Sequence, residues 1–217
     1  MGVVPRSSRV VVRISVPRAA SVYACVSLAT VRVCPSTSVK ERSTTTGASF
    51  FLVIAMETVA AAQILREQLP GLKVRVVNVV DLMTLIRPKD HPHGMTSTLF
   101  TELFTDTVDV VFAFHGYPGA IHQLVHGRPD ADRFRVRGFI EQGTTTTPFD
   151  MTVRNKASRY HLVIDAINNA RRLPVGATDL KEWCEAQLRR HEKYVVEHLE
   201  DMPEVRDWSL GDWAHHG

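Results

Sequence analysis

The stretch VDVVFAFHGYPGAIHQLVH, residues 108–126, decides the fold class of this chain. Its first seven residues are apolar apart from Asp109, as expected for a strand that is buried on both faces of a sheet. Gly116 and Pro118 mark the turn that follows, and a helix is expected from Gly119 to His126. A buried strand, a tight turn and a helix in this order form one unit of a helix-covered sheet.

The same alternation of apolar runs with amphipathic stretches extends over residues 50–217. Lys73–Val80 is rich in valine and predicts a second buried strand, side by side with residues 108–114. Phe50–Ala55 is interpreted as a further strand. Helices are expected over residues 57–69, 96–104, 156–172 and 179–199, a strand around 134–140, and a packed tail over 202–208. The predicted fold class is α/β, a three-layer domain with a central, mainly parallel sheet.

Residues 1–49 differ from the rest of the chain in composition. They carry seven basic residues and one acidic residue, Glu41, whereas residues 50–217 carry 19 basic and 22 acidic residues. They show neither sustained alternation nor a helical period. Their Arg-rich and Ser-rich composition is typical of a mitochondrial transit peptide, but scattered prolines and the lack of an amphipathic stripe argue against one. We therefore expect a disordered or non-native leader over 1–49 and a folded domain over 50–217.

Cysteine usage and apolar run length exclude several protein classes. Cys25, Cys34 and Cys184 are too few and too scattered for a disulfide framework, and no C-x-x-C pair is present. No apolar run approaches the roughly 20 residues that a membrane-spanning helix needs. No basic and aromatic platform for nucleic acid is present either. The expectation is a cytoplasmic protein that binds neither membrane nor nucleic acid.

Two loops carry the candidate binding residues. His115, Gly116 and Tyr117 follow the carboxyl end of a buried strand, where open α/β sheets usually bind ligands, and glycine permits a close backbone approach. Thr144 and Thr145 belong to a run of four threonines whose hydroxyl and N–H groups could hold a phosphate, although no lysine follows. The structural alternatives are a strand-to-helix turn for the first loop and a bend leading into a helix for the second.

Bulky apolar residues in the same two loops suggest an interface. Tyr117, Phe149 and Met151 would form exposed apolar surface if this domain belongs to a larger assembly. The alternative is that they fold back onto their own helices. Separately, His122 and His126 stand four residues apart on an expected helix, a spacing that suits a metal ion, but no third ligand is identified and Gln123 stands where a hydrolytic zinc helix has glutamate.

Four segments closely resemble the C-terminal domain of bacterial and fungal phosphoketolases. They are LKVRVVNVVDLM (72–83), FAFHGYP (112–118), GTTTTPFDM (143–151) and EDMPEVRDW (200–208), and the resemblance spans residues 56–208. Phosphoketolases are aldehyde-lyases that cleave xylulose 5-phosphate or fructose 6-phosphate with inorganic phosphate to acetyl phosphate and an aldose phosphate. They use thiamine diphosphate and a magnesium ion, which two other, transketolase-like domains bind.

The resemblance implies that this chain holds no catalytic, cofactor-binding or metal-binding residue of its own. It implies a C-terminal fragment that is inactive alone and whose partners are the phosphoketolase domains it lacks or a second copy. The alternative is a free-standing docking or regulatory module that binds a phosphoketolase body or a phosphorylated ligand.

The resemblance also implies a fold like that of the transketolase C-terminal domain. In the family a strand and a Gly-Asp-containing loop precede the helix that begins near Glu57. Here Phe50–Ala55 runs straight into Met56 without that loop, so the homologous segment is expected to start at Met56, although a strand over Phe50–Ala55 could still fill the position in the sheet.

Overall fold

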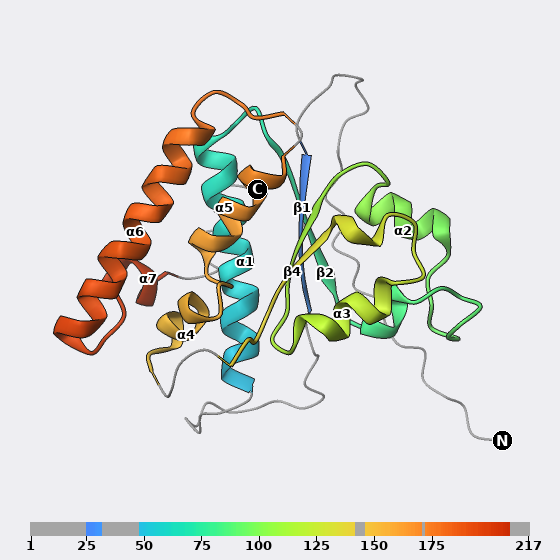
Figure 1. Ribbon diagram of the computed structural model, residues 1–217, viewed down its shortest axis with the longest axis horizontal. Helices are drawn as coiled ribbons and strands as arrows, with labels where there is room; N and C mark the ends of the chain where they lie inside the picture. Colours follow the sequence, from blue (N-terminus) through green and yellow to red (C-terminus); the bar gives the residue numbers. More distant parts are fainter. Residues whose placement is uncertain (1–24, 32–47, 142–145, 171, 209–217) are drawn as a thin grey trace.

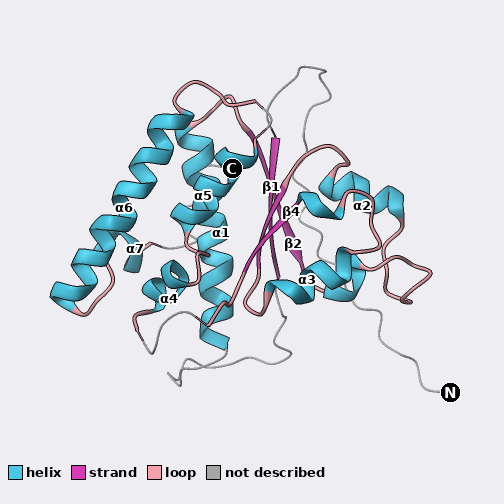
Figure 2. Ribbon diagram, viewed as in Figure 1, coloured by secondary structure: helices cyan, strands magenta, loops and turns pink. Residues whose placement is uncertain are grey.

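The computed structural model describes residues 25–31, 48–141, 146–170 and 172–208. Four strands form one sheet in the order β2-β1-β3-β4, and each neighbouring pair is parallel. The strands are β1 Cys25–Val31, β2 Lys73–Val79, β3 Val110–Ala113 and β4 Phe134–Arg137. Helices cover both faces of the sheet (Figure 1 and Figure 2). The predicted α/β fold with a central parallel sheet is confirmed.

The two faces carry different helices (Figure 1). On one face α1 and α5 contact the sheet, and α6 packs on α5 and α4 outside them; α2, α3 and two 3-10 helices lie on the other. The helices are α1 Ala48–Gln68, η1 Leu82–Leu85, α2 Ser97–Phe104, α3 Pro118–Val125, η2 Ala131–Arg133, α4 Pro148–Arg154, α5 Arg159–Asn169, α6 Ala177–His198 and α7 Pro203–Arg206. None of the described helices has both the length and the apolar character that crossing a bilayer requires.

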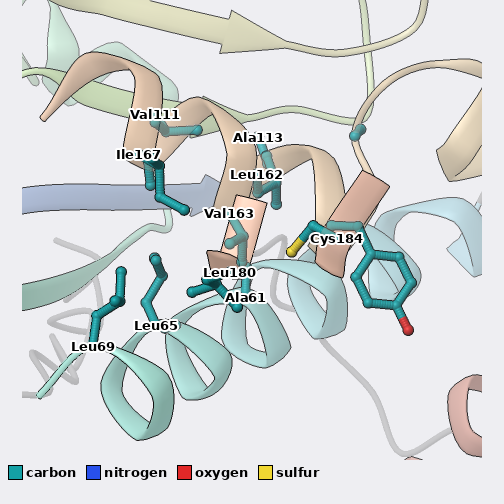
Figure 3. Close-up of a cluster of buried hydrophobic side chains, with 14 of the residues drawn as sticks. Ala61, Leu65, Leu69, Val111, Ala113, Leu162, Val163, Ile167, Leu180 and Cys184 are labelled. Carbon is teal, nitrogen blue, oxygen red and sulfur yellow. The ribbon is translucent and has the colours of Figure 1, made fainter. Parts of the chain in front are cut away.

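The sheet has one hydrophobic core on each face, and strand β3 supplies side chains to both. Val111 and Ala113 pack with Leu65 of α1 and Leu162 of α5 on one face (Figure 3). Val110 and Phe112 point into the other core. All four β3 residues are buried because helices cover both faces, which explains the continuous apolar run in the sequence.

The strand prediction for Phe50–Ala55 is wrong, because these residues lie inside α1. Ile54 is buried in the same core as the later residues of that helix. A short apolar run does not distinguish a strand from a buried helix by its pattern alone. Here the run continues without a break into the amphipathic stretch that follows, and the helix includes both.

The expected adjacency of the two valine-rich strands is also wrong. β1 lies between β2 and β3, with Leu28 opposite Val76 on one side and Val111 on the other. The sheet therefore includes residues 25–31, for which the sequence predicted no element. The rest of the expected leader, residues 1–24 and 32–47, lies outside the described residues, so the prediction of disorder there remains a prediction.

One expected helix differs from the structure in its bounds. The helix expected over 156–172 is α5, which begins later, at Arg159, and ends earlier, at Asn169, and a separate helix, α4, ends at Arg154. Between them Lys156 adopts a left-handed backbone with φ of 55°, which a continuous helix does not allow. The tail does pack on the domain as expected, since Met202 and Val205 are buried.

Candidate functional site at the carboxyl edge of the sheet

The loop after β3 and the segment after β4 are joined by backbone hydrogen bonds beyond the ends of the strands. The Phe114 N–H donates to the Arg137 carbonyl at 2.8 Å, and the Phe139 N–H donates to the Gly116 carbonyl at 2.9 Å. These bonds continue the parallel ladder past the regular strands. The residues between them are thereby held in place on the rigid sheet.

Two glycines lie at this close approach. A Cβ atom on Gly138 would lie 2.3 Å from the Gly116 carbonyl oxygen, and one on Gly116 would lie 2.8 Å from Cε1 of Phe114. Gly138 is therefore the glycine that permits the two backbone segments to approach, whereas a side chain on Gly116 would meet the Phe114 ring. The expectation that Gly116 admits a ligand or a neighbouring domain stays a prediction.

Tyr117 is the most exposed of the candidate residues. Its side chain is 55% exposed, and its ring stands edge-on to Phe139 with the centroids 5.8 Å apart. The Tyr117 hydroxyl donates to Oε1 of Glu141, which is also exposed. This hydrogen bond raises the pKa of Tyr117, because losing the proton would leave two negative charges side by side. The phenol therefore stays protonated at neutral pH.

His115 is half-buried against the ring of Phe114, with the ring centroids 4.7 Å apart. Burial lowers the pKa of His115, so its imidazole is neutral at pH 7. This neutral imidazole, two residues along the chain from Tyr117, offers hydrogen-bonding groups and apolar surface. The arrangement suits recognition of another molecule.

The threonine loop forms the start of α4. Thr144 and Thr145 lie outside the described residues, but Thr147 is the N-cap of α4, and its Oγ1 accepts from the Asp150 N–H at 3.4 Å. The Thr146 hydroxyl donates to Oδ2 of Asp150 at 2.6 Å. In its described part, this loop is therefore the bend leading into a helix.

Phe149 does not belong to an exposed interface. Its side chain is only 3% exposed and packs edge-on against the rings of Tyr160 and His191. Pro148 starts α4, and the first turn of this helix directs Phe149 into the core. Met151 is half-buried, so Tyr117 is the one exposed residue of the three that the sequence placed in an interface.

A buried ion pair that the sequence reasoning missed joins α1 to α5. The Arg159 guanidinium donates to both oxygens of Glu57, at 2.6 and 3.0 Å, and the Arg159 backbone N–H donates to the same carboxylate at 2.7 Å. Both side chains are almost fully buried. No sequence signal connects residues this far apart, since neither local spacing nor helical periodicity relates them.

A second cluster of buried polar residues surrounds the start of α4. Asp201 accepts from the Phe149 N–H at 3.1 Å and from the Thr147 hydroxyl at 2.5 Å. His191 of α6 is fully buried, and its Nε2 lies 3.5 Å from Oδ1 of Asp150. Burial lowers the pKa of His191, and the nearby carboxylates partly oppose this shift. These contacts anchor α4 and α6, and Asp150, His191 and Asp201 are all buried.

Ser158 and His161 have the spacing of a nucleophile and its base, since Ser158 Oγ lies 2.8 Å from His161 Nδ1. Ser158 is fully buried at the N-cap of α5, however. Burial also lowers the pKa of His161 to about 4, too low for a general base at neutral pH. The pair therefore orders the first turn of α5.

The candidate metal ligands on α3 are not brought together with others. His122 and His126 are both exposed, and within the described ranges no group of three His, Cys, Asp or Glu side chains could hold a metal ion. His93 Nδ1 instead lies 3.0 Å from Oδ2 of Asp81 in the loop after β2. The described residues do not fit the oxygen-rich site that a magnesium ion bound to a diphosphate would require.

Comparison with known proteins gives one consistent family. A family model described as "XFP C-terminal domain" matches residues 36–210. The chain is 52% identical over 159 residues to a probable phosphoketolase of Brucella abortus. It is 51% identical over 156 residues to one of Bradyrhizobium diazoefficiens and 48% identical over 160 residues to one of Chlorobaculum tepidum. These matches cover 72 to 74% of this chain but only 20% of each relative.

Proposed function

This chain belongs to the family of phosphoketolase C-terminal domains, and on that premise we propose that it serves a phosphoketolase as a structural and assembly domain. The observation that carries the proposal is the family match over residues 36–210, together with about 50% identity to probable phosphoketolases. Because the chain spans 20% of the length of those relatives, the groups that perform the reaction belong to the other four fifths in this proposal.

The proposed whole enzyme cleaves xylulose 5-phosphate or fructose 6-phosphate with phosphate, releasing acetyl phosphate and an aldose phosphate. In the family, thiamine diphosphate supplies the carbanion chemistry and magnesium holds its diphosphate. We assign no step of this reaction to the described residues, because their donor set does not fit that cofactor.

The geometry of the domain supports an assembly role. Its buried polar groups fix α1, α4, α5 and α6 to one another, and its carboxyl edge presents Tyr117 on hydrogen-bonded backbone. A rigid domain with a fixed surface can position neighbouring domains without contributing a reacting group.

The first test is an assay of the purified chain with xylulose 5-phosphate, phosphate, thiamine diphosphate and magnesium. We expect no acetyl phosphate, because the chain is proposed to lack the cofactor-binding groups. Turnover that depends on thiamine diphosphate would contradict the proposal.

The second test is a chimera in which the matched residues of this chain replace the corresponding segment of the Brucella abortus phosphoketolase. We expect the chimera to produce acetyl phosphate, whereas the same enzyme with the segment deleted does not. A chimera that is folded but inactive, beside an active parent enzyme, would show that this domain cannot serve a phosphoketolase.

A further inference from the structure

Exposed apolar side chains gather where strands of the sheet end. Val80 and Met83 follow β2 and are 48% and 38% exposed; Tyr117 follows β3 and is 55% exposed; Ile140 follows β4 and is 41% exposed. Each lies at most four residues past the end of its strand. Because all the strands are parallel, these positions share one edge of the sheet, which we call the carboxyl edge.

The side chains at the β4 end of this edge are held by the backbone around them. The Ile140 N–H donates to Oδ1 of Asn155 at 2.9 Å, and Asn155 is itself buried and donates to the Met151 carbonyl at 2.8 Å. Tyr117 is fixed through the Gly116–Phe139 bond and its own bond to Glu141. Binding a partner here would cost little ordering entropy, because the surface is already in place.

We propose that the carboxyl edge docks this domain onto the remaining four fifths of a phosphoketolase chain, with Tyr117 and Ile140 at the centre of the contact. This inference rests on the proposed function. Residues 80, 83, 117 and 140 all lie within the family match, and the relatives carry a further 80% of chain that such a domain must pack against. Exposed apolar side chains clustered on a rigid surface are typical of an interface within a larger chain.

The chemistry of the edge suits a protein surface. Tyr117 combines a large ring with a hydroxyl that is already hydrogen-bonded, a combination enriched at interfaces. The edge spans three strand spacings, about 14 Å from β2 to β4, which lies within a standard protein interface. Other exposed apolar residues lie elsewhere, with Val175 before α6 and Leu199 at its end. They provide matched controls.

The direct test is hydroxyl-radical footprinting of the unmodified chain and of the chimera with the Brucella abortus enzyme. We expect Tyr117 and Ile140 to be oxidised readily in the free chain and about fivefold or more slowly in the chimera, because the interface excludes water there. Val175 and Leu199 should be oxidised at the same rate in both proteins. Equal oxidation of Tyr117 and Ile140 in a folded, active chimera would overturn the docking site and leave the proposed function standing.

The second measurement compares two double variants of the chimera. Tyr117→Ser with Ile140→Ser should lower acetyl phosphate production about tenfold or more and add a separate thermal transition for the domain, as expected when hot-spot side chains are lost. Val175→Ser with Leu199→Ser should leave both unchanged. If the double variant with Tyr117→Ser and Ile140→Ser does not fold as a free chain, the single variant Ile140→Ser replaces it. In that case the footprint of the unmodified chimera still shows whether the carboxyl edge is covered.

Two further outcomes would also overturn the proposal. Self-association of the free chain that Tyr117→Ser abolishes would identify the edge as a contact between copies. A chimera that fails to fold or to turn over substrate would remove the proposed function and the docking site together.

Discussion

Glu57 of α1 and Arg159 of α5 show how one buried ion pair joins residues that lie 102 positions apart. The carboxylate accepts three hydrogen bonds from Arg159, and the guanidinium also lies 5.1 Å from the ring of Trp208. A buried charge is tolerated only while its partner is present, because neither group can recover its hydration in the core.

We expect Glu57→Gln to lower the free energy of unfolding by about 3 to 5 kcal/mol, since it leaves the Arg159 charge buried without its counter-ion. Urea unfolding at pH 7 measures this change. Arg190→Gln, which breaks an exposed pair with Glu204, is the matched control and should have almost no effect. Equal effects of the two substitutions would show that the buried pair does not stabilise the fold.

The lowered pKa of His161 allows a prediction of how the stability of the fold depends on pH. Burial lowers its pKa from 6.5 to about 4 in the folded state, so the unfolded state binds the proton more tightly. Stability is therefore fully present above about pH 6.5 and falls as the pH drops towards 4. At pH 5, protonation of His161 in the unfolded state alone lowers the free energy of unfolding by about 2 kcal/mol. The pKa of the buried His191 is lowered too, so its protonation acts in the same direction.

Urea unfolding at pH 7 and pH 5 tests this expectation, with His161→Asn as the comparison. The variant should lose about 2 kcal/mol less than the wild-type chain between the two pH values. The ring protons of His161 should not titrate between pH 5.5 and 8 in NMR spectra. A midpoint near 6.5 for His161 would contradict the prediction.

At the scale of the element, the sequence predicts the strands and helices that carry a single strong pattern. β3 is recognised because both of its faces are buried. The start expected for the helix over 96–104 agrees with the structure, in which Thr96 is the N-cap of α2 and its side chain accepts from the Leu99 N–H. Where several signals compete, prediction fails. The left-handed backbone at Lys156 separates α4 from α5, and no glycine or proline marks it in the sequence.

One glycine of the carboxyl edge, Gly138, and one glycine of α3, Gly119, provide a matched test at this scale. Gly138→Ala should destabilise the domain by about 2 to 3 kcal/mol, because its new methyl group would meet the Gly116 carbonyl, a backbone atom that cannot move aside. Gly119→Ala adds the same atom where nothing lies within 4 Å, in the first turn of α3, and should raise stability by up to about 1 kcal/mol.

Thermal and urea unfolding of both glycine variants measure these changes. Gly138→Ala should also alter the hydroxyl-radical reactivity of Tyr117, because the backbone that holds Tyr117 must shift. A Gly138→Ala variant as stable as the Gly119→Ala variant would show that the approach of the two segments is not tight.

At the scale of the whole molecule, the sequence places the candidate site better than it places the sheet around it. The position of His115 to Tyr117 follows from one strand-turn-helix pattern. The contacts of Tyr117 with Phe139 and Glu141 depend on the parallel pairing of β3 with β4, and local sequence patterns do not specify which strands pair. The strand order was missed because β1 was not recognised as a strand. It is a seven-residue run, CVSLATV, within an arginine-rich and proline-rich segment.

The last prediction concerns this central strand. β1 pairs with β2 on one side and β3 on the other, so a chain that starts at residue 48 would leave two strands without their shared neighbour. We expect that shortened chain to lose cooperative unfolding and to bind a hydrophobic dye such as ANS, because unpaired strand edges and core surface become exposed.

A chain that starts at residue 25 retains β1 and should unfold cooperatively, with a urea midpoint close to that of the full chain. Leu28→Pro in the full chain is the point-substitution counterpart, since proline removes a backbone donor from a strand that has neighbours on both sides. It should destabilise the domain by about 3 kcal/mol or more. If the chain starting at residue 48 unfolds at the same urea concentration as the full chain, then residues 50–217 form the domain alone, as the sequence first indicated, and β1 is dispensable.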